Sequence, residues 1–245
     1  MENITIKGLD IPAIYHPCNR GNYGGSRPLS AIKYIVIHYT ANLWDSAKSN
    51  LNYFANNVVK ASANYFVDSK TIGVCVPDEC YAWHCGGGLQ GVGSHKWFNI
   101  CNNWNSIGIE ICHDKKTGDY YPDEDTYRNV VQLTAYLMKK YNVPIENVIR
   151  HYDVTAKCCP KYWAGEDNTP QYKDWLKFKE AVEEEVAVRY KTINEVPDSI
   201  RKEVKEVIDA GCLKGNGEKG IDMTFNELRV LVICLRIVKF FTGKK

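Results

Sequence analysis

Two histidines and a cysteine in this sequence have the types and spacing of metal ligands. His151 follows the apolar stretch Val148–Ile149, and Cys159 comes eight residues later. Earlier in the chain, Tyr34–Ile37 leads directly into His38. Two imidazoles and one thiolate suit zinc, and three protein ligands leave the fourth tetrahedral position open for water. Such an arrangement is typical of a catalytic metal, so hydrolysis is the first hypothesis.

Glu110 and Lys157 are the candidates for proton transfer and for charge stabilisation beside such a metal. Glu110 interrupts the largely apolar stretch 106–112, where a buried carboxylate without a partner is costly. The carboxylate could act as general base on an attacking water, and the Lys157 ammonium could stabilise an oxyanion. A salt-bridged carboxylate and a solvated loop lysine are the structural alternatives. Cys158 is a rival for the ligand role of Cys159.

A second group of candidates lies at Trp83 and His84, just before the glycines 86–88. Glycines let the backbone come close to a ligand. His84 could be a fourth metal ligand, a surface residue or a substrate contact, and substrate contact is the favoured hypothesis. Trp83 could belong to the core or to the same contact surface. Asp153 could accept a hydrogen bond from a ligand histidine and so orient its ring.

The composition is that of an ordinary soluble globular protein, with 44% hydrophobic and 24% charged residues among 245. A net charge of +2 gives no reason to expect a nucleic-acid partner. Residues 1–7 lack a basic segment followed by an apolar core, so we expect no secretory signal and reduced thiols among the ten cysteines. The stretch 230–241 is too short and too charged for a membrane span, which needs roughly 20 apolar residues.

The order of predicted elements indicates an α/β fold with a mixed sheet flanked by helices. The first thirty residues are rich in Gly, Asn and Pro, which predicts an irregular arm. Apolar and β-branched runs predict strands at 33–38, 65–67, 71–76, 106–112 and from 148 onward, with 68–70 as the turn of a strand pair. Helical spacing of apolar residues predicts helices at 45–59, 122–141 and 174–190.

The sequence pattern changes near residue 190, which predicts two domains, 1–190 and 191–245. The second part contains two helical patterns, 199–210 and 224–240. Gly211 is a normal helix stop, and Thr224 with Glu227 forms a capping-box signature. A helical module of about fifty residues is only marginally stable alone and is expected to need a partner surface.

Five segments, in this order, resemble the zinc-dependent N-acetylmuramoyl-L-alanine amidases of the phage-lysozyme and peptidoglycan-recognition-protein type. The resemblance covers residues 25–165 and is specific in combination, although each segment alone is weak. It is strongest to endolysins and to prophage or autolytic amidases of Gram-positive bacteria. The segments are Y-I-V-I-H-Y-T-A-N (34–42), S-A-N-Y-F-V-D (62–68), A-W-H (82–84), N-S-I-G-I-E-I-C (105–112) and R-H-Y-D-V-T-A-K-C-C-P (150–160).

This resemblance implies a zinc-floored groove that binds peptidoglycan and cleaves the amide bond between N-acetylmuramic acid and L-alanine. The family's zinc ligands fall on His38, His151 and Cys159, with the following proline supporting Cys159 over Cys158. Its strand glutamate falls on Glu110, and its lysine falls on Lys157. Substrate contacts are expected at His84, Trp83 and Asn64.

Two positions depart from the family pattern. Asn64 stands where many bacterial relatives have histidine, and Ala63 stands where some relatives carry a tyrosine of the site. Tyr65 lies two positions later, displaced by about 7 Å along a strand, so no tyrosine role is carried over. The other functional hypotheses are a non-catalytic peptidoglycan-binding module and a zinc peptidase that acts within the stem peptide.

The resemblance also implies where the protein acts. Without an export signal, we expect a phage or prophage endolysin that is made in the cytoplasm and reaches the cell wall after release. An autolysin exported by another route is the alternative. The tail is similar to the short helical modules of clostridial-type endolysins, which implies either cell-wall targeting or self-association into a homo-oligomer through the C-terminal helices.

Overall fold

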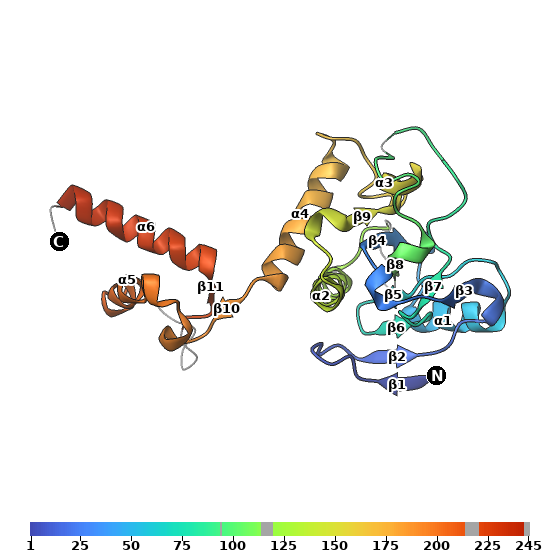
Figure 1. The fold of residues 1–245 in the computed structure, drawn as a ribbon, viewed down its shortest axis with the longest axis horizontal. Helices are drawn as coiled ribbons and strands as arrows, with labels where there is room; N and C mark the ends of the chain where they lie inside the picture. Colours follow the sequence, from blue (N-terminus) through green and yellow to red (C-terminus); the bar gives the residue numbers. More distant parts are fainter. Residues whose placement is uncertain (94, 114–119, 214–220, 243–245) are drawn as a thin grey trace. The chain divides into compact units, whose positions relative to one another are not determined.

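The computed structural model describes residues 1–93, 95–113, 120–213 and 221–242, and it divides into two compact units (Figure 1). The first unit is Met1–Val186 and the second is Ala187–Lys245. The boundary thus lies four residues before the one expected from the sequence. The reason is that β10 (Arg189–Tyr190) pairs antiparallel with β11 (Met223–Thr224), which ties it to the second unit.

A mixed seven-stranded sheet forms the centre of the first unit, in the order β1-β2-β6-β5-β8-β4-β9. β4 runs parallel to β8 and β9, β5 parallel to β8, and β2 parallel to β6. The β1–β2 and β5–β6 pairs are antiparallel. The predicted mixed sheet is therefore confirmed. Its strands are β1 (Glu2–Ile4), β2 (Ala13–Tyr15), β4 (Tyr34–Tyr39), β5 (Tyr65–Val67), β6 (Ile72–Val74), β8 (Ser106–Ile111) and β9 (Val148–Arg150).

Helices pack on both faces of this sheet, as the alternation of side chains along β4 requires. Ile35 and Ile37 lie in one core with apolar residues of α2 (Glu124–Tyr141) and α4 (Pro170–Val186). The opposite face meets α1 (Ala47–Asn56), where Leu51 packs on Phe66 of β5. His38, one residue after Ile37, therefore belongs to the α1 face of the sheet.

The first thirty residues are not the irregular arm that their composition predicts. β1 and β2 extend the sheet at its edge, and β3 (Tyr23–Ser26) pairs antiparallel with β7 (Cys80–Ala82). These strands have only three or four residues each and are separated by Gly- and Pro-containing turns, so no run is long enough to show a period. Ile4 and Ile6 are nevertheless packed against the main core, which holds the segment in place.

The second unit has its own small core between α5 (Asp198–Asp209) and α6 (Phe225–Thr242). The predicted capping box at the start of α6 is confirmed: the Glu227 carboxylate accepts from the Thr224 amide at 2.6 Å, and the Thr224 hydroxyl accepts from the Glu227 amide at 3.3 Å. Within the described residues, no helix combines the length and apolar character needed to cross a membrane.

Candidate active site

The ends of β4 and β8 place His38 and Glu110 side by side. The two strands are parallel and His38 is the register partner of Glu110, so both side chains leave the sheet on the same face. Phe66 of β5 is the next partner across from Glu110. Since α1 packs on this face beside Phe66, the strand ends form the floor of a site and α1 forms one wall.

A single helical turn brings His151 and Cys159 to the same place. The sequence predicted His151 as the end of a strand, but it is the first residue of α3 (His151–Thr155), which begins where β9 ends. Ala156 adopts a left-handed conformation with φ of 57° and turns the chain back. The Tyr152 amide then donates to the Cys159 carbonyl at 2.9 Å, which places Cys159 beside the start of α3.

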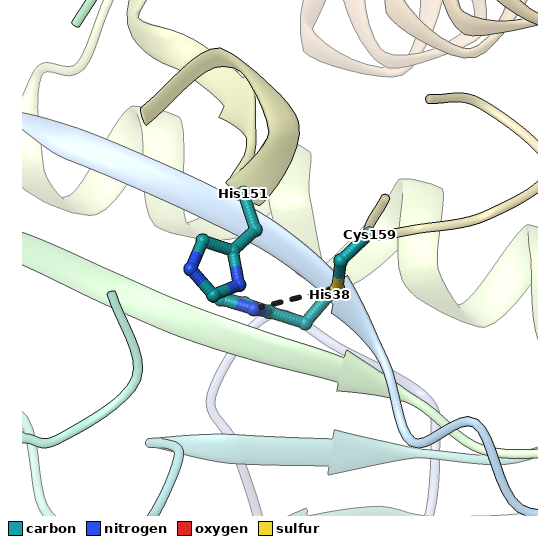
Figure 2. Close-up of side chains that lie close together, drawn as sticks. All are labelled: His38, His151 and Cys159. Carbon is teal, nitrogen blue, oxygen red and sulfur yellow. Dashed lines mark hydrogen bonds between the residues drawn. The ribbon is translucent and has the colours of Figure 1, made fainter. Parts of the chain in front are cut away.

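The three predicted ligands meet in space (Figure 2). One ligand atom from each of His38, His151 and Cys159 lies within 4.8 Å of the other two, and all three residues are buried. The Cys159 Sγ is 3.8 Å from Nδ1 of His38, and the rings of His38 and His151 are 4.6 Å apart. Cys158 is exposed, so burial separates the two adjacent cysteines in favour of Cys159.

The donor set fits a metal ion because His151 has no other use for its ring nitrogens. Both are buried and without a hydrogen-bond partner among the described residues. An unpartnered polar group in the interior costs free energy that a metal–ligand bond removes. Burial, with the positive charge of Lys157 next, lowers the pKa of His151 to about 3. The imidazole is therefore neutral at physiological pH, which is the form that binds a metal.

The pKa shifts of His38 and Cys159, the other two candidate ligands, run in opposite directions. Burial, followed by the nearby His151, lowers the pKa of His38 well below 6.5, so this ring is also neutral. Burial raises the pKa of the Cys159 thiol, so the apolar surroundings alone favour the protonated form. A cation reverses that preference because the thiolate is the form that coordinates.

Glu110 is held in an environment that makes its carboxylate a base near neutral pH. Its Oε2 is shielded from solvent and has no hydrogen-bond partner among the residues described. Burial raises the pKa of Glu110 from 4.5 to about 7, against a lowering effect of Lys157 and a further raising effect of Asp45. Lys157 itself is exposed. Its charge acts on the pKa of Glu110, His151 and Cys159 alike, so it lies near the whole cluster.

A cavity of about 480 Å³ adjoins Glu110 on the same face of the sheet. Asp45, Asn50 and Tyr53 are among the residues that line it on the α1 side, and Phe66 lines it on the sheet side. Asp45 is fixed there, because its carboxylate accepts from the His113 amide at 2.8 Å and from Nδ2 of Asn50 at 2.6 Å. The cavity has both polar and aromatic lining residues, most of them on α1 or in the segment between β4 and α1.

Known proteins resemble this chain in sequence and in fold. The family described as N-acetylmuramoyl-L-alanine amidase (Amidase_2) matches residues 28–162, which is more than half of the chain. The chain belongs to this amidase family. Residues 28–162 include the three candidate ligands, Glu110 and Lys157, whereas the second unit lies outside the match.

Individual relatives of this amidase domain cover it to different extents. A probable N-acetylmuramoyl-L-alanine amidase of Bacillus licheniformis is 37% identical over 139 residues, which are 55% of this chain and 38% of the relative. CwlA of Bacillus subtilis strain 168 is 31% identical over 180 residues, 73% of this chain and 59% of the relative. The chain thus spans between 38% and 59% of the length of these two curated relatives.

Solved structures resemble the amidase domain over almost their whole length. The catalytic domain of XlyA is 26% identical with a TM-score of 0.54, covering 69% of this chain and 98% of that one. PlyL is 29% identical with a TM-score of 0.55, covering 71% and 97%. A mutant endolysin from Bacillus subtilis is 28% identical with a TM-score of 0.53, covering 70% and 99%.

In the amidase domain, Asn64 and His84 both have partners within the protein. Asn64 is fully buried; its Oδ1 accepts from the Gly108 amide at 3.1 Å and its Nδ2 donates to the Val76 carbonyl at 3.1 Å. Its role is therefore to join β8 to the segment after β6. His84 lies against His38, with 3.0 Å between Nδ1 of His84 and Nε2 of His38. For Trp83, which is half-buried, substrate contact stays a prediction.

Ser106 and Gly108 of β8 contact the His84 ring, and the sequence predicted no role for either residue. Ser106 accepts or donates toward Nε2 of His84 at 3.1 Å, and a Cβ on Gly108 would lie 2.7 Å from Cγ of the same ring. The available signal was Gly108 itself, because a glycine inside a strand marks a close approach by another group. Nothing in the spacing indicated that this group would be His84.

Asp153 also has a partner other than the predicted one. Its carboxylate accepts from Nε and Nη2 of buried Arg150 at 3.0 and 2.5 Å, and from the Arg150 amide at 2.9 Å. Arg150 further donates to the carbonyls of Trp163 and Gly165 at 2.5 and 3.0 Å. The ion pair therefore holds the chain on both sides of the His151–Cys159 loop, and Asp153 does not orient a ligand histidine.

Replacing Asp153 by alanine is expected to destabilise the amidase domain by about 3–5 kcal/mol, because it leaves the Arg150 guanidinium buried without its counter-ion. Urea unfolding of both proteins measures the difference. Asp174→Ala is the matched control, since it removes an exposed pair with Lys177, which is worth at most about 1 kcal/mol. Equal effects of the two substitutions would show that the buried pair does not hold the loop.

Proposed function

We propose that this chain is a peptidoglycan hydrolase that cleaves the amide bond between N-acetylmuramic acid and L-alanine of the stem peptide. The observation that carries the proposal is the buried cluster of His38, His151 and Cys159 beside Glu110, on the floor of an amidase-family fold. The names of the curated relatives, N-acetylmuramoyl-L-alanine amidases from Bacillus, support this bond as the target. An endolysin, from a phage or prophage, is the proposed biological setting.

We propose zinc as the metal. Two neutral imidazoles and a thiolate would hold it, and three protein ligands of these types are the usual composition of a catalytic zinc site. When bound, zinc supplies a positive charge that makes water more acidic and polarises a carbonyl group.

The role of Glu110 in this reaction is to accept the proton of the attacking water. With a pKa of about 7, a substantial fraction of the carboxyl is ionised near neutral pH. The buried Oε2 without a partner is available for that proton. Glu110 then passes the proton to the amine of L-alanine as the amide bond breaks, so the carboxylate is regenerated.

Lys157 is proposed to stabilise the oxyanion that forms when water adds to the scissile carbonyl. Its side chain is exposed, and its charge lowers the pKa of Glu110 and Cys159, which supports a position close to the candidate ligands. A fixed positive charge at that place lowers the energy of the tetrahedral intermediate more than that of the neutral carbonyl. The cavity along α1 is proposed to hold part of the stem peptide.

Product analysis of digested cell wall tests the proposal. We expect new α-amino groups that belong to L-alanine and no new reducing sugar ends, with activity lost on chelation and restored by zinc. New amino groups on another stem residue would instead identify a peptidase. Binding to the wall without any new amino group would identify a recognition module, and either outcome would overturn the proposal.

The second unit is proposed to associate with a second copy of itself, with cell-wall binding as the alternative outcome of its test. α6 exposes Val230, Ile233, Ile237 and Phe240, which repeat every three to four residues as the seam of paired helices does. Glu203 and Glu206 of α5 form ion pairs with Arg236 and Lys239 of α6, so the side of α6 that faces α5 is distinct from this apolar row.

The substitution Ile237→Glu is therefore expected to convert a dimer to a monomer in sedimentation experiments without changing the helix content. Arg229→Glu, also on α6, is the charge control and should leave the dimer intact. A full-length chain that is monomeric at all concentrations but loses wall binding when residues 187–245 are removed would replace self-association by wall targeting.

A further inference from the structure

We propose that His84 and Ser106 form a hydrogen-bonded relay that fixes the tautomer of His38 and so presents its Nδ1 to the metal. His84 is thus a positioning residue. The proposal deepens the function given above and rests on it for the presence of a metal at this site, but the relay itself is a property of the metal-free chain.

The relay is a continuous line of four groups. Nε2 of His38 is 3.0 Å from Nδ1 of His84, and Nε2 of His84 is 3.1 Å from the Ser106 hydroxyl oxygen. The Ser106 hydroxyl is in turn 2.5 Å from the carbonyl oxygen of Asn102. The rings of His38 and His84 meet edge to face, with planes 89° apart and centroids 5.1 Å apart.

The Asn102 carbonyl, the last group of the relay, determines where each proton lies. The Asn102 carbonyl can only accept, so the single hydroxyl proton of Ser106 is committed to it. The Ser106 oxygen must then accept from His84, which places the His84 proton on Nε2 and leaves Nδ1 as a lone pair. His38 must therefore donate through Nε2–H. Its unprotonated nitrogen is Nδ1, the atom that lies 3.8 Å from Sγ of Cys159.

Local structure holds the His84 ring in this line. The backbone amides of His84 and Cys85 both donate to Oδ1 of Asn103, at 3.0 and 2.9 Å, which fixes the start of the loop. The ring then lies over Gly108, where a Cβ would come within 2.7 Å of Cγ. Any side chain at position 108 would push the ring away from His38, so the glycine is part of the relay's construction.

This geometry also decides between the roles considered for His84. Both of its ring nitrogens are engaged, one with His38 and one with Ser106, so neither is left for a metal or for substrate. Ligand histidines generally donate their second ring N–H to an acceptor that fixes ring orientation, and loss of that acceptor weakens metal affinity by about 10–100-fold. In this chain the acceptor is the His84 imidazole, which Ser106 orients.

Nitrogen-15 NMR of histidine-labelled, metal-free protein tests the proposal directly. We expect the His38 ring to carry its proton on Nε2, and the His84 ring to donate through Nε2–H to Ser106. A His38 ring with its proton on Nδ1 in the metal-free wild-type chain would overturn the proposal. Because this measurement needs neither metal nor substrate, a failure of the proposed wall hydrolysis would not be mistaken for a failure of the relay.

Metal affinity, measured by competition with a chelator, gives the second readout. His84→Ala should weaken zinc binding by about 10–100-fold and abolish the single His38 tautomer. Gly108→Ala should act in the same direction by displacing the ring, and Ser106→Ala should have a smaller effect because His84 still accepts from His38. His95→Ala, a surface histidine, is the control. Folded His84→Ala and Gly108→Ala proteins with wild-type affinity would contradict the proposal.

Discussion

Replacing His151 by alanine is expected to abolish stoichiometric metal binding and, with it, all detectable wall hydrolysis. His151 supplies one of only three ligand atoms in the cluster, and its ring nitrogens have no other hydrogen-bond partner among the described residues. Two remaining ligands do not hold zinc against solvent in a site built for three protein donors. Metal analysis after dialysis and the rate of wall digestion measure the two effects.

The matched control for this experiment is His95→Ala, which removes an imidazole from an exposed loop. It should retain one metal ion per chain and wild-type activity. Circular dichroism and thermal unfolding of His151→Ala separate the loss of a ligand from the loss of the fold. A folded, metal-free His151→Ala protein that still cleared cell walls would remove the metal site from the mechanism.

The substitution Glu110→Gln is expected to leave metal binding intact but to lower turnover by about 10²–10⁴-fold, the usual contribution of a positioned general base. Glutamine keeps the shape of the side chain and cannot accept the proton of the attacking water. Initial rates on purified peptidoglycan, with metal content determined on the same samples, measure the effect. A turnover near that of the wild type would mean that another group acts as the base.

The same variant should change how stability depends on pH in the metal-free protein. Because burial raises the pKa of Glu110 from 4.5 to about 7, the folded chain binds more protons at this site than the unfolded chain does between these values. The free energy of unfolding therefore falls as pH rises through that window. The free energy of unfolding of Glu110→Gln minus that of the wild type should therefore be larger above pH 7 than at pH 4, by up to about 3 kcal/mol. Urea unfolding at pH 4 and pH 8 measures this, and a pH-independent difference would contradict the environment assigned to Glu110.

The elements that carry the ligands could be predicted because each has a strong local pattern. The run of β-branched residues before His38 and the alternating isoleucines around Glu110 both form strands that are buried on both faces. Their parallel pairing in register then places the imidazole and the carboxylate together. His151 and Cys159 were predicted to lie together as candidate ligands, although the single helical turn between them was too short to be recognised from periodicity.

The contacts of His84 and Asn64 could not be predicted, because each has a partner that the chain brings near only in three dimensions. His84 meets His38 across 46 residues of sequence, and Asn64 meets Gly108 across 44. For Asp153 the partner was close in sequence, three residues away. Asp153 could have paired with Arg150 or with His151, and the turn that α3 makes decides between them.

Anomalous diffraction at the zinc edge from crystals of the wild-type protein tests the central claim most directly. We expect one ion per chain, bound by Nδ1 of His38, a ring nitrogen of His151 and Sγ of Cys159, at about 2.0–2.1 Å for nitrogen and about 2.3 Å for sulfur. An ion bound elsewhere, or zinc-loaded crystals with these three side chains free of metal, would contradict it.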